Sequence, residues 1–438
     1  MAVAAPASAE LARRLQAAIP STPAPDEAAR LAVGRPRELA TDLLAGLATA
    51  EQPEPWLRPR LRDLRRLRSR QRRLAQDALF AAIRHRPLIA ALTDPSPDSL
   101  WTGGLVLAGG LEAEAELAPL VEAEALVAFT ASMAPEQVLA LVGGLPPWLV
   151  DRLVAQRGLD EAVDLTIALL GRAPTTLRAN TDRCTRPALA AALEREGVAT
   201  LSTAHAPHGL HLVGTANLPQ LRCFKNGWFE VQDEASQLAA LLVSPAPGLV
   251  VDLCCGAGGK ALALPLHPGA ELLGFDVRGG ALQTAEKRAR RAGRRLKVRK
   301  LPRGEAPDLP PRSASRVLVD APCTGTGTLR RTPARRWSLH PDELHAATAL
   351  QAELLDTAAE LVAPSGELVY ATCSLLAEEN EAQVAALLDR HPRFQRSDPT
   401  PLLGPNAQEL QRGGALDMDP ARHGSDGFFA CVLVASPA

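Results

Sequence analysis

The stretch Leu-Val-Val-Asp-Leu-Cys-Cys-Gly-Ala-Gly-Gly-Lys at 249–260 decides the fold. Its apolar first half is typical of a buried strand, and its glycines are typical of a turn at which a helix begins. Glycine lets the backbone approach a ligand, and a helix N-terminus favours anionic groups. A Walker loop is excluded because Cys254 stands where that motif needs Gly, and Ala261 where it needs Ser or Thr. We predict a ligand-binding turn, with a tight turn that binds nothing as the alternative.

Strand-like and helix-like patterns alternate after this turn. Four more apolar runs and three helical patterns follow, at 271–276, 279–292, 316–322, 342–363, 366–373, 377–390 and 427–434. Such alternation predicts an α/β fold with a doubly wound, mostly parallel sheet. An acid, Asp276, ends the second strand 24 residues after Asp252, where it suits a ribose diol. These features alone leave NAD and S-adenosylmethionine both open.

The rest of the chain divides into three segments that differ in residue composition and hydrophobic periodicity. Residues 1–34 are rich in Ala and Pro and predict a loosely ordered lead-in. Helical periodicity over 35–170 predicts an all-helical domain, and mixed patterns over 171–235 predict a small α/β subdomain before the α/β domain at 236–438.

Composition excludes several classes of protein. A hydrophobic fraction of 46% with 22% charged residues excludes wholesale disorder. The seven cysteines are odd in number and show no C-x-x-C spacing, which argues against a disulfide framework or a zinc site and favours a reducing cytosol. The sequence shows neither a signal peptide nor an apolar run near the ~20 residues of a membrane span. We therefore expect a cytoplasmic protein without metal.

Two cysteines stand at equivalent strand ends. Asp320-Ala-Pro-Cys323 closes one predicted strand, and Thr372-Cys373-Ser374 closes the next. If these strands are parallel neighbours, they lie ~5 Å apart and both thiols reach the same rim with Asp320. A lone Cys is more often a small buried apolar residue, but two in matched positions favour chemistry. A thiolate that adds to C6 of a pyrimidine makes C5 nucleophilic, provided that local positive charge or a helix N-terminus assists its ionisation.

These motifs resemble those of the RsmB/NOP (Sun/Fmu-type) family of RNA cytosine-5 methyltransferases. The matching segments read DLCCGAGGK (252–260), DAPCTGTGTLRR (320–331), ATCS (371–374), VQDEASQL (231–238) and DGFFA (426–430). Further upstream, 147–150 and 177–180 resemble the family's linker and small RNA-binding subdomain. The resemblance is strong from about 145 to 434 and weaker over 35–140. The resemblance implies a class I, Rossmann-like methyltransferase domain, preceded by that subdomain and by an all-α domain like the antitermination factor NusB.

The resemblance also implies roles for single residues. Cys373 would be the nucleophile, Cys323 would assist breakdown of the covalent adduct, and Asp320 would contact the N3 edge of cytosine. Two thiols imply an RNA rather than a DNA substrate. The cofactor would be S-adenosyl-L-methionine, held by Asp252, Cys254, Cys255, Gly256, Ala257, Gly258, Gly259, Lys260, Asp276, Arg278, Glu305 and Asp320. Here Gly256-Ala257 replaces the family's Ala-Pro, which makes the loop more flexible.

Charge is distributed unevenly. The net charge is −1, yet nine Arg fall within 58–73 and ten basic residues within 287–303, whereas 111–125 is acidic. Such runs predict a surface for RNA phosphates, with a solvated helix face as the alternative. We also expect RNA contacts from Arg178, Asn180, Arg330, Arg331, Arg335 and Arg336.

Taken together, the sequence predicts a monomeric, S-adenosylmethionine-dependent RNA (cytosine-5) methyltransferase that acts on ribosomal RNA. The alternative is a non-catalytic RNA-binding or ribosome-assembly factor that kept the fold.

Overall fold

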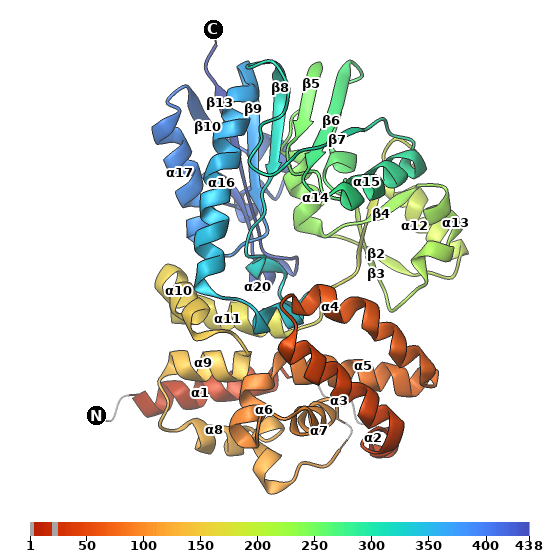
Figure 1. Cartoon of the computed structure of the whole chain (residues 1–438), viewed down its shortest axis with the longest axis vertical. Helices are drawn as coiled ribbons and strands as arrows, with labels where there is room; N and C mark the ends of the chain where they lie inside the picture. Colours follow the sequence, from red (N-terminus) through yellow and green to blue (C-terminus); the bar gives the residue numbers. More distant parts are fainter. Residues whose placement is uncertain (1–3, 20–24, 110, 438) are drawn as a thin grey trace. The chain divides into compact units, whose positions relative to one another are not determined.

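The chain forms two compact units. The computed structural model describes residues 4–19, 25–109 and 111–437. Unit 1 comprises Met1–Arg172 and Leu329–Pro341, and unit 2 comprises Ala173–Thr328 and Asp342–Ala438 (Figure 1). The chain thus passes from unit 1 to unit 2, returns for a short segment, and leaves again.

Unit 1 is helical throughout its described residues. Its helices are α1 (Ala4–Ala17), α2 (Pro25–Leu31), α3 (Gly34–Thr49), α4 (Pro53–Arg60), α5 (Ser69–Arg84), α6 (Arg86–Leu92), α7 (Pro97–Leu107), α8 (Ala123–Thr130), α9 (Pro135–Gly143), α10 (Pro147–Arg157) and α11 (Leu159–Leu170). The expected loose lead-in over 1–34 is wrong for the described residues. Leu11 and Leu15, one turn apart on α1, are buried, and α1 packs against α8 and α9.

The segment Leu329–Pro341 is held by unit 1, although the sequence placed it in the 236–438 domain. Its Trp337 donates from Nε1 to the carbonyl of Ile83 at 2.9 Å. Arg336 donates to the carbonyl of Leu169 at 2.9 Å, at the C-terminal end of α11. A guanidinium there satisfies a helix-end carbonyl and complements the helix dipole, so the segment is locked in place.

Unit 2 begins with a small antiparallel sheet. Its strands β1 (Thr176–Ala179), β2 (Thr200–Ser202), β3 (Gly209–Leu212) and β4 (Phe229–Val231) lie in the order β2-β3-β1-β4. The helices α12 (Arg186–Arg195) and α13 (Arg222–Lys225) accompany them. Leu177, Leu193 and Phe229 are fully buried in its core.

The large sheet of unit 2 is doubly wound. Its order is β11-β12-β13-β9-β8-β5-β6-β7, and β10 pairs with β13. The strands are β5 (Gly248–Asp252), β6 (Ala270–Asp276), β7 (Lys297–Lys300), β8 (Ala314–Asp320), β9 (Val362–Thr372), β10 (Phe394–Ser397), β11 (Gln411–Arg412), β12 (Ala415–Met418) and β13 (Phe428–Ala435). The pairs among β5 to β9 are parallel, and β12 and β13 form an antiparallel edge. The predicted Rossmann-like class I architecture is confirmed.

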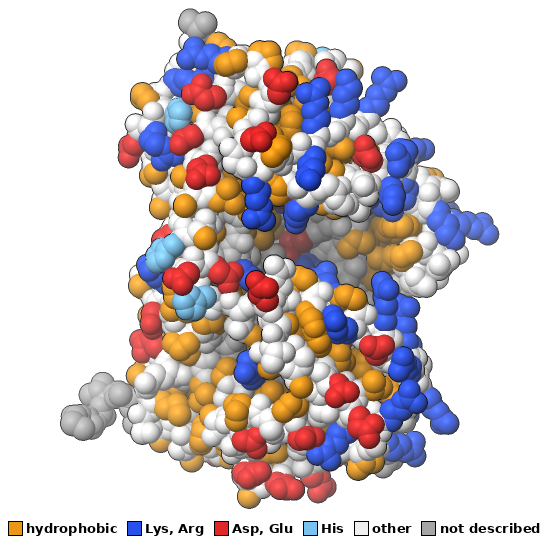
Figure 2. Space-filling model, viewed as in Figure 1, with side chains coloured by type: hydrophobic (Ala, Val, Ile, Leu, Met, Phe, Trp, Pro, Cys, Tyr) orange, Lys and Arg blue, Asp and Glu red, His pale blue; other side chains and the backbone are white. Residues whose placement is uncertain are grey.

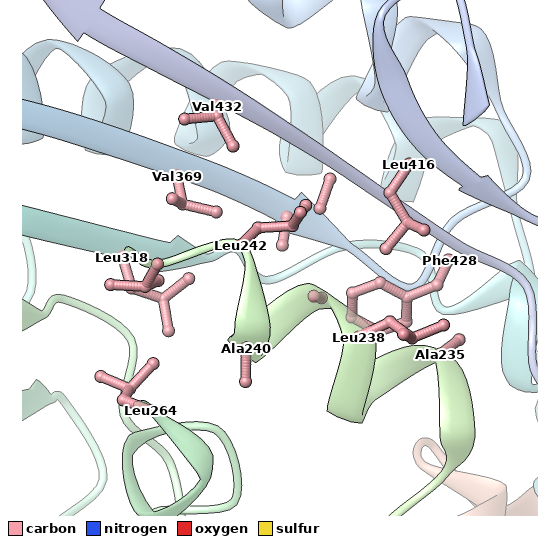
Figure 3. Close-up of a cluster of buried hydrophobic side chains, with 14 of the residues drawn as sticks. Ala235, Leu238, Ala240, Leu242, Leu264, Leu318, Val369, Leu416, Phe428 and Val432 are labelled. Atoms are coloured by element: carbon pink, nitrogen blue, oxygen red, sulfur yellow. The ribbon is translucent and has the colours of Figure 1, made fainter. Parts of the chain in front are cut away.

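Apolar side chains cover both faces of this sheet. The main helices are α14 (Glu234–Leu241), α15 (Gly279–Ala292), α16 (Pro341–Leu361) and α17 (Glu381–Arg390), and the short α18 (Thr400–Leu403), α19 (Ala407–Leu410) and α20 (Pro420–His423) follow. On one face Leu238 of α14 packs among Leu318, Val369 and Phe428 (Figure 3). Strands buried on both faces read as continuous apolar runs, which is why the sequence revealed them. Among the described residues, no helix has the length and apolar character needed to cross a bilayer.

Candidate active site

Two thiols meet where neighbouring parallel strands end. Cys323 follows β8 and Cys373 follows β9, and the register pairs Asp320 with Ala371. The two Sγ atoms lie 3.4 Å apart. Both residues are half-buried, so the pair lies at the rim of the sheet rather than within its core. The alternation of strands and helices in the sequence predicted this arrangement, because neighbouring parallel strands end at the same edge of the sheet.

A buried carboxylate links the turns that follow the two thiols. Glu379 is fully buried. Its Oε1 accepts from the backbone N–H of Thr324 at 2.8 Å and from Gln351 Nε2 at 3.0 Å. Its Oε2 accepts from the hydroxyls of Thr324 and Ser374, each at 2.5 Å. Thr324 follows Cys323 and Ser374 follows Cys373, so one side chain holds both turns.

Sequence reasoning missed Glu379. It lies in the run Glu378-Glu379-Asn380-Glu381, which reads as the acidic start of a helix. Only its burial separates Glu379 from the other two acids. Its neighbour Asn380 adds to the same network, since it donates to the carbonyl of Ser374 at 3.0 Å and accepts from the hydroxyl of Thr372.

The environment of Cys323 favours its protonated form. Its hydrogen bond with Cys373, its burial, and the charges of Cys373 and Glu379 raise the pKa of Cys323 well above its usual value. A thiol in this state retains its proton at neutral pH. The two sulfurs therefore differ in environment although they lie in contact.

A lysine–aspartate pair lies near the end of β8. Lys260 Nζ is 2.6 Å from Oδ2 of Asp320, and it also lies 4.5 Å from the centre of the Phe428 ring. Asp252 is buried, and its Oδ1 has no hydrogen-bond partner among the described residues. Burial, followed by the charge of Asp320, raises the pKa of Asp252 to about 7.

The glycine-rich turn is held mainly by backbone contacts. Cys255 donates its N–H to the carbonyl of Phe275 at 2.7 Å, and Gly256 donates to Oδ2 of Asp276 at 2.8 Å. Gly258 has a positive φ of 79°, and a Cβ there would lie 3.0 Å from the Cβ of Ala285. Both constraints require glycine at 258.

The expected helix after this turn does not form. Only one 3-10 turn, Ala261–Ala263, follows Lys260. Leu264 is extended, with φ −58° and ψ 134°, because Pro265 disfavours helical backbone at the residue before it. The favourable helix N-terminus that the glycines suggested is therefore absent from this turn.

Arg288 of α15 supports the turn instead. It donates from Nη1 to the carbonyl of Ala257 at 2.9 Å, and its Nε lies 3.0 Å from Oε2 of the buried Glu230. Arg291, one helical turn later, pairs with the same Glu230. The loop at Gly256-Ala257 is thus anchored by a side chain from another element.

Asp276 already has partners of its own. It accepts from the backbone N–H of Arg278 at 2.8 Å and from the guanidinium Nε at 3.0 Å. Burial opposes ionisation, but the hydrogen bonds from Arg278 and Gly256 outweigh it and lower the pKa of Asp276. Cys254 is half-buried beside this acid, and Glu305 lies exposed in the loop after β7.

Several predicted RNA-contacting residues are buried instead. Arg178 is 6% exposed and donates to Oε1 of Gln232 at 2.6 Å, whereas Asn180 donates to the carbonyls of Gly227 and Ala292. Arg330 and Arg336 are also buried. Arg178, Asn180 and Arg336 bond to backbone carbonyls or to a neighbouring side chain, so their burial does not fit the predicted RNA surface.

The remaining basic residues differ in exposure. Arg331 and Arg335 are half-buried within the segment that unit 1 holds. Within 287–303, Arg294 pairs with Asp182 and Lys297 with Glu271. Seven of the ten basic residues within 287–303 are exposed: Lys287, Arg290, Arg295, Lys297, Arg299, Lys300 and Arg303. Eight of the nine Arg within 58–73 are exposed as well: Arg58, Arg60, Arg62, Arg65, Arg66, Arg68, Arg70 and Arg73. Basic side chains line the edge of unit 1 where α4 and α5 lie (Figure 2).

Comparisons with known proteins point in one direction. Residues 240–434 match a family model described as 16S rRNA methyltransferase RsmB/F, and residues 145–218 match a ferredoxin-like domain of RsmF/B-like methyltransferases. The ribosomal RNA small subunit methyltransferase B of Vibrio cholerae is 35% identical over 306 residues, which is 66% of this chain and 65% of that protein. The match thus covers slightly less than two thirds of the relative's length.

Solved structures share the fold. The protein PH0851 superposes with a TM-score of 0.73 at 24% identity, covering 92% of this chain and 99% of that one. A methyltransferase homologue from Pyrococcus horikoshii gives a TM-score of 0.55 at 24% identity, covering 68% of this chain and 98% of that one.

Proposed function

The chain belongs to the RsmB/F family, and on that basis we propose that it is an S-adenosylmethionine-dependent methyltransferase that modifies C5 of cytosine in ribosomal RNA. The observation that carries the proposal is the contact between Cys323 and Cys373, 3.4 Å apart at a rim that also bears Asp320. Cytosine C5 needs a nucleophile at C6 before it can accept a methyl group, and a thiolate is suited to that addition.

The glycine-rich turn fits the cofactor. Three carboxylates, Asp252, Asp276 and Asp320, lie at the ends of adjacent strands and complement a cation. The unpartnered Oδ1 of Asp252 is available to a ligand, and Asp276 ends its strand where a ribose diol is held in this fold. S-adenosylmethionine bound here supplies a methyl group on a positively charged sulfur.

The chain's own residues then divide the chemistry. Cys373 loses its proton and forms a bond to C6 of the cytosine, which places the ring electrons on C5 for attack on the methyl group. After transfer, the C5 proton passes to solvent, the electrons of the C5–H bond re-form the C5–C6 double bond, and the Cys373–C6 bond breaks with its electrons returning to the sulfur. Cys323, in contact with that sulfur, assists this breakdown. Asp320, paired with Lys260, contacts the N3 edge of the base.

The RNA must present the cytosine unstacked. A base in a duplex cannot reach a thiol at the end of a strand, so it must be single-stranded or turned out of its stack. We assign phosphate contacts to the exposed arginines within 58–73, which position the strand without reading its sequence. We expect this methylation to take place in the cytoplasm, where ribosomal subunits assemble.

Substituting the two thiols tests the proposal. Cys373→Ala should abolish 5-methylcytosine formation on ribosomal RNA, because no group then activates C5. Cys323→Ala should leave protein covalently attached to RNA, visible as a shifted band on a denaturing gel. Wild-type levels of 5-methylcytosine from the Cys373→Ala protein would show that the mechanism is wrong.

A non-catalytic assembly factor is the second candidate. Two observations favour it: no α-helix follows the glycine-rich turn, and Arg278 occupies the carboxylate of Asp276. Calorimetry with S-adenosylmethionine separates the two functions. Saturable binding supports the enzyme, whereas no detectable heat supports the assembly factor.

A further inference from the structure

Glu379 is a buried carboxylate whose hydrogen bonds are fully accounted for. Four donors converge on it, two at each oxygen. A carboxylate has about four acceptor positions, so this set saturates it and stabilises its charge without water. An anion held in this way costs little to retain, whereas removing one partner would leave an uncompensated charge in the interior.

The four donors join elements that carry both thiols. Thr324 lies directly after Cys323, and Ser374 directly after Cys373. Gln351 of α16 reaches the same oxygen as the Thr324 N–H and also donates to the carbonyl of Pro322 at 2.9 Å. The turn of Cys323 is thus fixed on both sides of the thiol, and Glu379 connects it to the turn of Cys373.

We propose that Glu379 is a positioning residue that ties the two thiol-bearing turns together and places a negative charge near Cys323. The inference rests on the proposed function and deepens it. Through Thr324 and Ser374, Glu379 holds the sulfurs in contact. Its charge adds to the hydrogen bond with Cys373 and to burial, which are the larger causes, in favouring the protonated form of Cys323. The titratable groups that act on Cys323 or feel its charge are Cys373, Glu379 and Tyr370.

The hydrogen-bond pattern allows charge and geometry to be separated. Both donors at Oε1 are N–H groups, which cannot reverse, whereas both donors at Oε2 are hydroxyls, which can rotate and accept. A glutamine with its oxygen at the Oε1 position and its NH₂ at the Oε2 position therefore keeps all four bonds. Glu379→Gln removes the charge alone. Glu379→Met, similar in size, removes the charge and the bonds.

Site-resolved alkylation tests the inference without RNA or cofactor. The full chain is treated with iodoacetamide across a pH series, and each thiol is followed by mass spectrometry. In Glu379→Gln, the midpoint of Cys323 alkylation should fall, because the nearby anion that helps to raise the pKa of Cys323 is gone. In the wild-type protein, alkylation of one thiol should slow alkylation of the other, because the two sulfurs are in contact. In Glu379→Met this effect should be lost, because the two turns separate.

The control is Glu378→Gln, which removes the neighbouring acid and should leave the alkylation profiles of both thiols at wild-type values. The inference is overturned if Cys323 in Glu379→Gln titrates as in wild type, or if Glu378→Gln moves it equally. If Glu379→Gln does not fold, Thr324→Val and Thr324→Ser replace it. Only the valine variant should then uncouple the thiols, and equal behaviour of the two variants would overturn the inference.

The same series separates this inference from the proposed function. If Glu379→Gln shifts the Cys323 profile but the wild-type protein transfers no methyl group, the role of Glu379 is supported and the methyltransferase function is contradicted. If Glu379→Gln transfers methyl groups at the wild-type rate and its Cys323 profile is unshifted, the methyltransferase function is supported and the role of Glu379 is contradicted.

Discussion

The thiol rim and the glycine-rich turn lie in one sheet but are constructed differently. At the rim, side chains of four residues, Thr324, Gln351, Ser374 and Glu379, form a closed and buried network. At the turn, backbone contacts and a single arginine hold a loop that no α-helix follows. We infer that the rim resists change, whereas the turn tolerates adjustment on ligand binding.

The largest expected effect lies at the rim. Asn380→Ala leaves the hydroxyl of Thr372 and the carbonyl of Ser374 without their buried partner. The free energy of unfolding should fall by about 2–3 kcal/mol. A urea titration with coincident fluorescence and circular dichroism measures it. A loss below ~0.5 kcal/mol would show that the rim is no more constrained than the turn.

Removing Arg288 should loosen the turn and also takes one partner from Glu230. Arg288→Ala leaves the carbonyl of Ala257 without its side-chain donor, so affinity for S-adenosylmethionine should fall about tenfold, as expected for a charged hydrogen bond. Calorimetry measures it. Arg291→Ala is the matched control, because Arg291 shares Glu230 but, in the described part of the chain, makes no hydrogen bond to the turn. Equal losses in both variants would assign the effect to Glu230.

The pH dependence of cofactor affinity should reflect Asp252. Its pKa is raised to about 7, so it is mainly neutral at pH 6 and mainly ionised at pH 8. A cationic ligand prefers the ionised form, and affinity should therefore rise several-fold across this interval and level off above it. The Asp252→Asn protein should show a flat profile. An affinity that falls with rising pH would contradict the assignment.

The smallest expected effect comes from Pro265. Pro265→Ala permits the turn after Lys260 to extend as a helix, whose N-terminus would then face the ligand. Cofactor affinity should change by about threefold or less, since the dipole of a partly exposed helix end contributes under ~1 kcal/mol. Circular dichroism and calorimetry together report it. A tenfold change would mean that the turn is less adaptable than the comparison implies.

The sequence predicted the site where local pattern determines structure. Apolar runs that end at Asp320 and just before Cys373 indicated buried parallel strands, and parallel strands end at one edge, so the sequence predicted that the thiols meet. The glycines at 256, 258 and 259 likewise predicted the turn from local sequence pattern alone. Both depend on residues near one another in sequence.

Features set by tertiary packing were not predictable. Arg336 and the exposed Arg62 look alike in sequence, yet Arg336 is buried because carbonyls from α11 and its own segment receive its guanidinium. Glu379 gave no signal for the same reason, since its donors come from three separate parts of the chain. The missing helix after Lys260 was predictable, because Pro265 is visible in the sequence.

The return of Leu329–Pro341 to unit 1 has a consequence for synthesis. A chain emerging from the ribosome has all the helices of unit 1 after residue 172, but it lacks the segment that carries Trp337 and Arg336. Those contacts can form only after residues 173–328 have also been made. Unit 1 therefore cannot finish folding until residue 341 has been made, by which point β1 to β8 of unit 2 have also been made, whereas an N-terminal domain ordinarily folds once its own residues emerge. A nascent chain stalled before residue 329 should be more sensitive to protease within α5 and α11 than one released after residue 341.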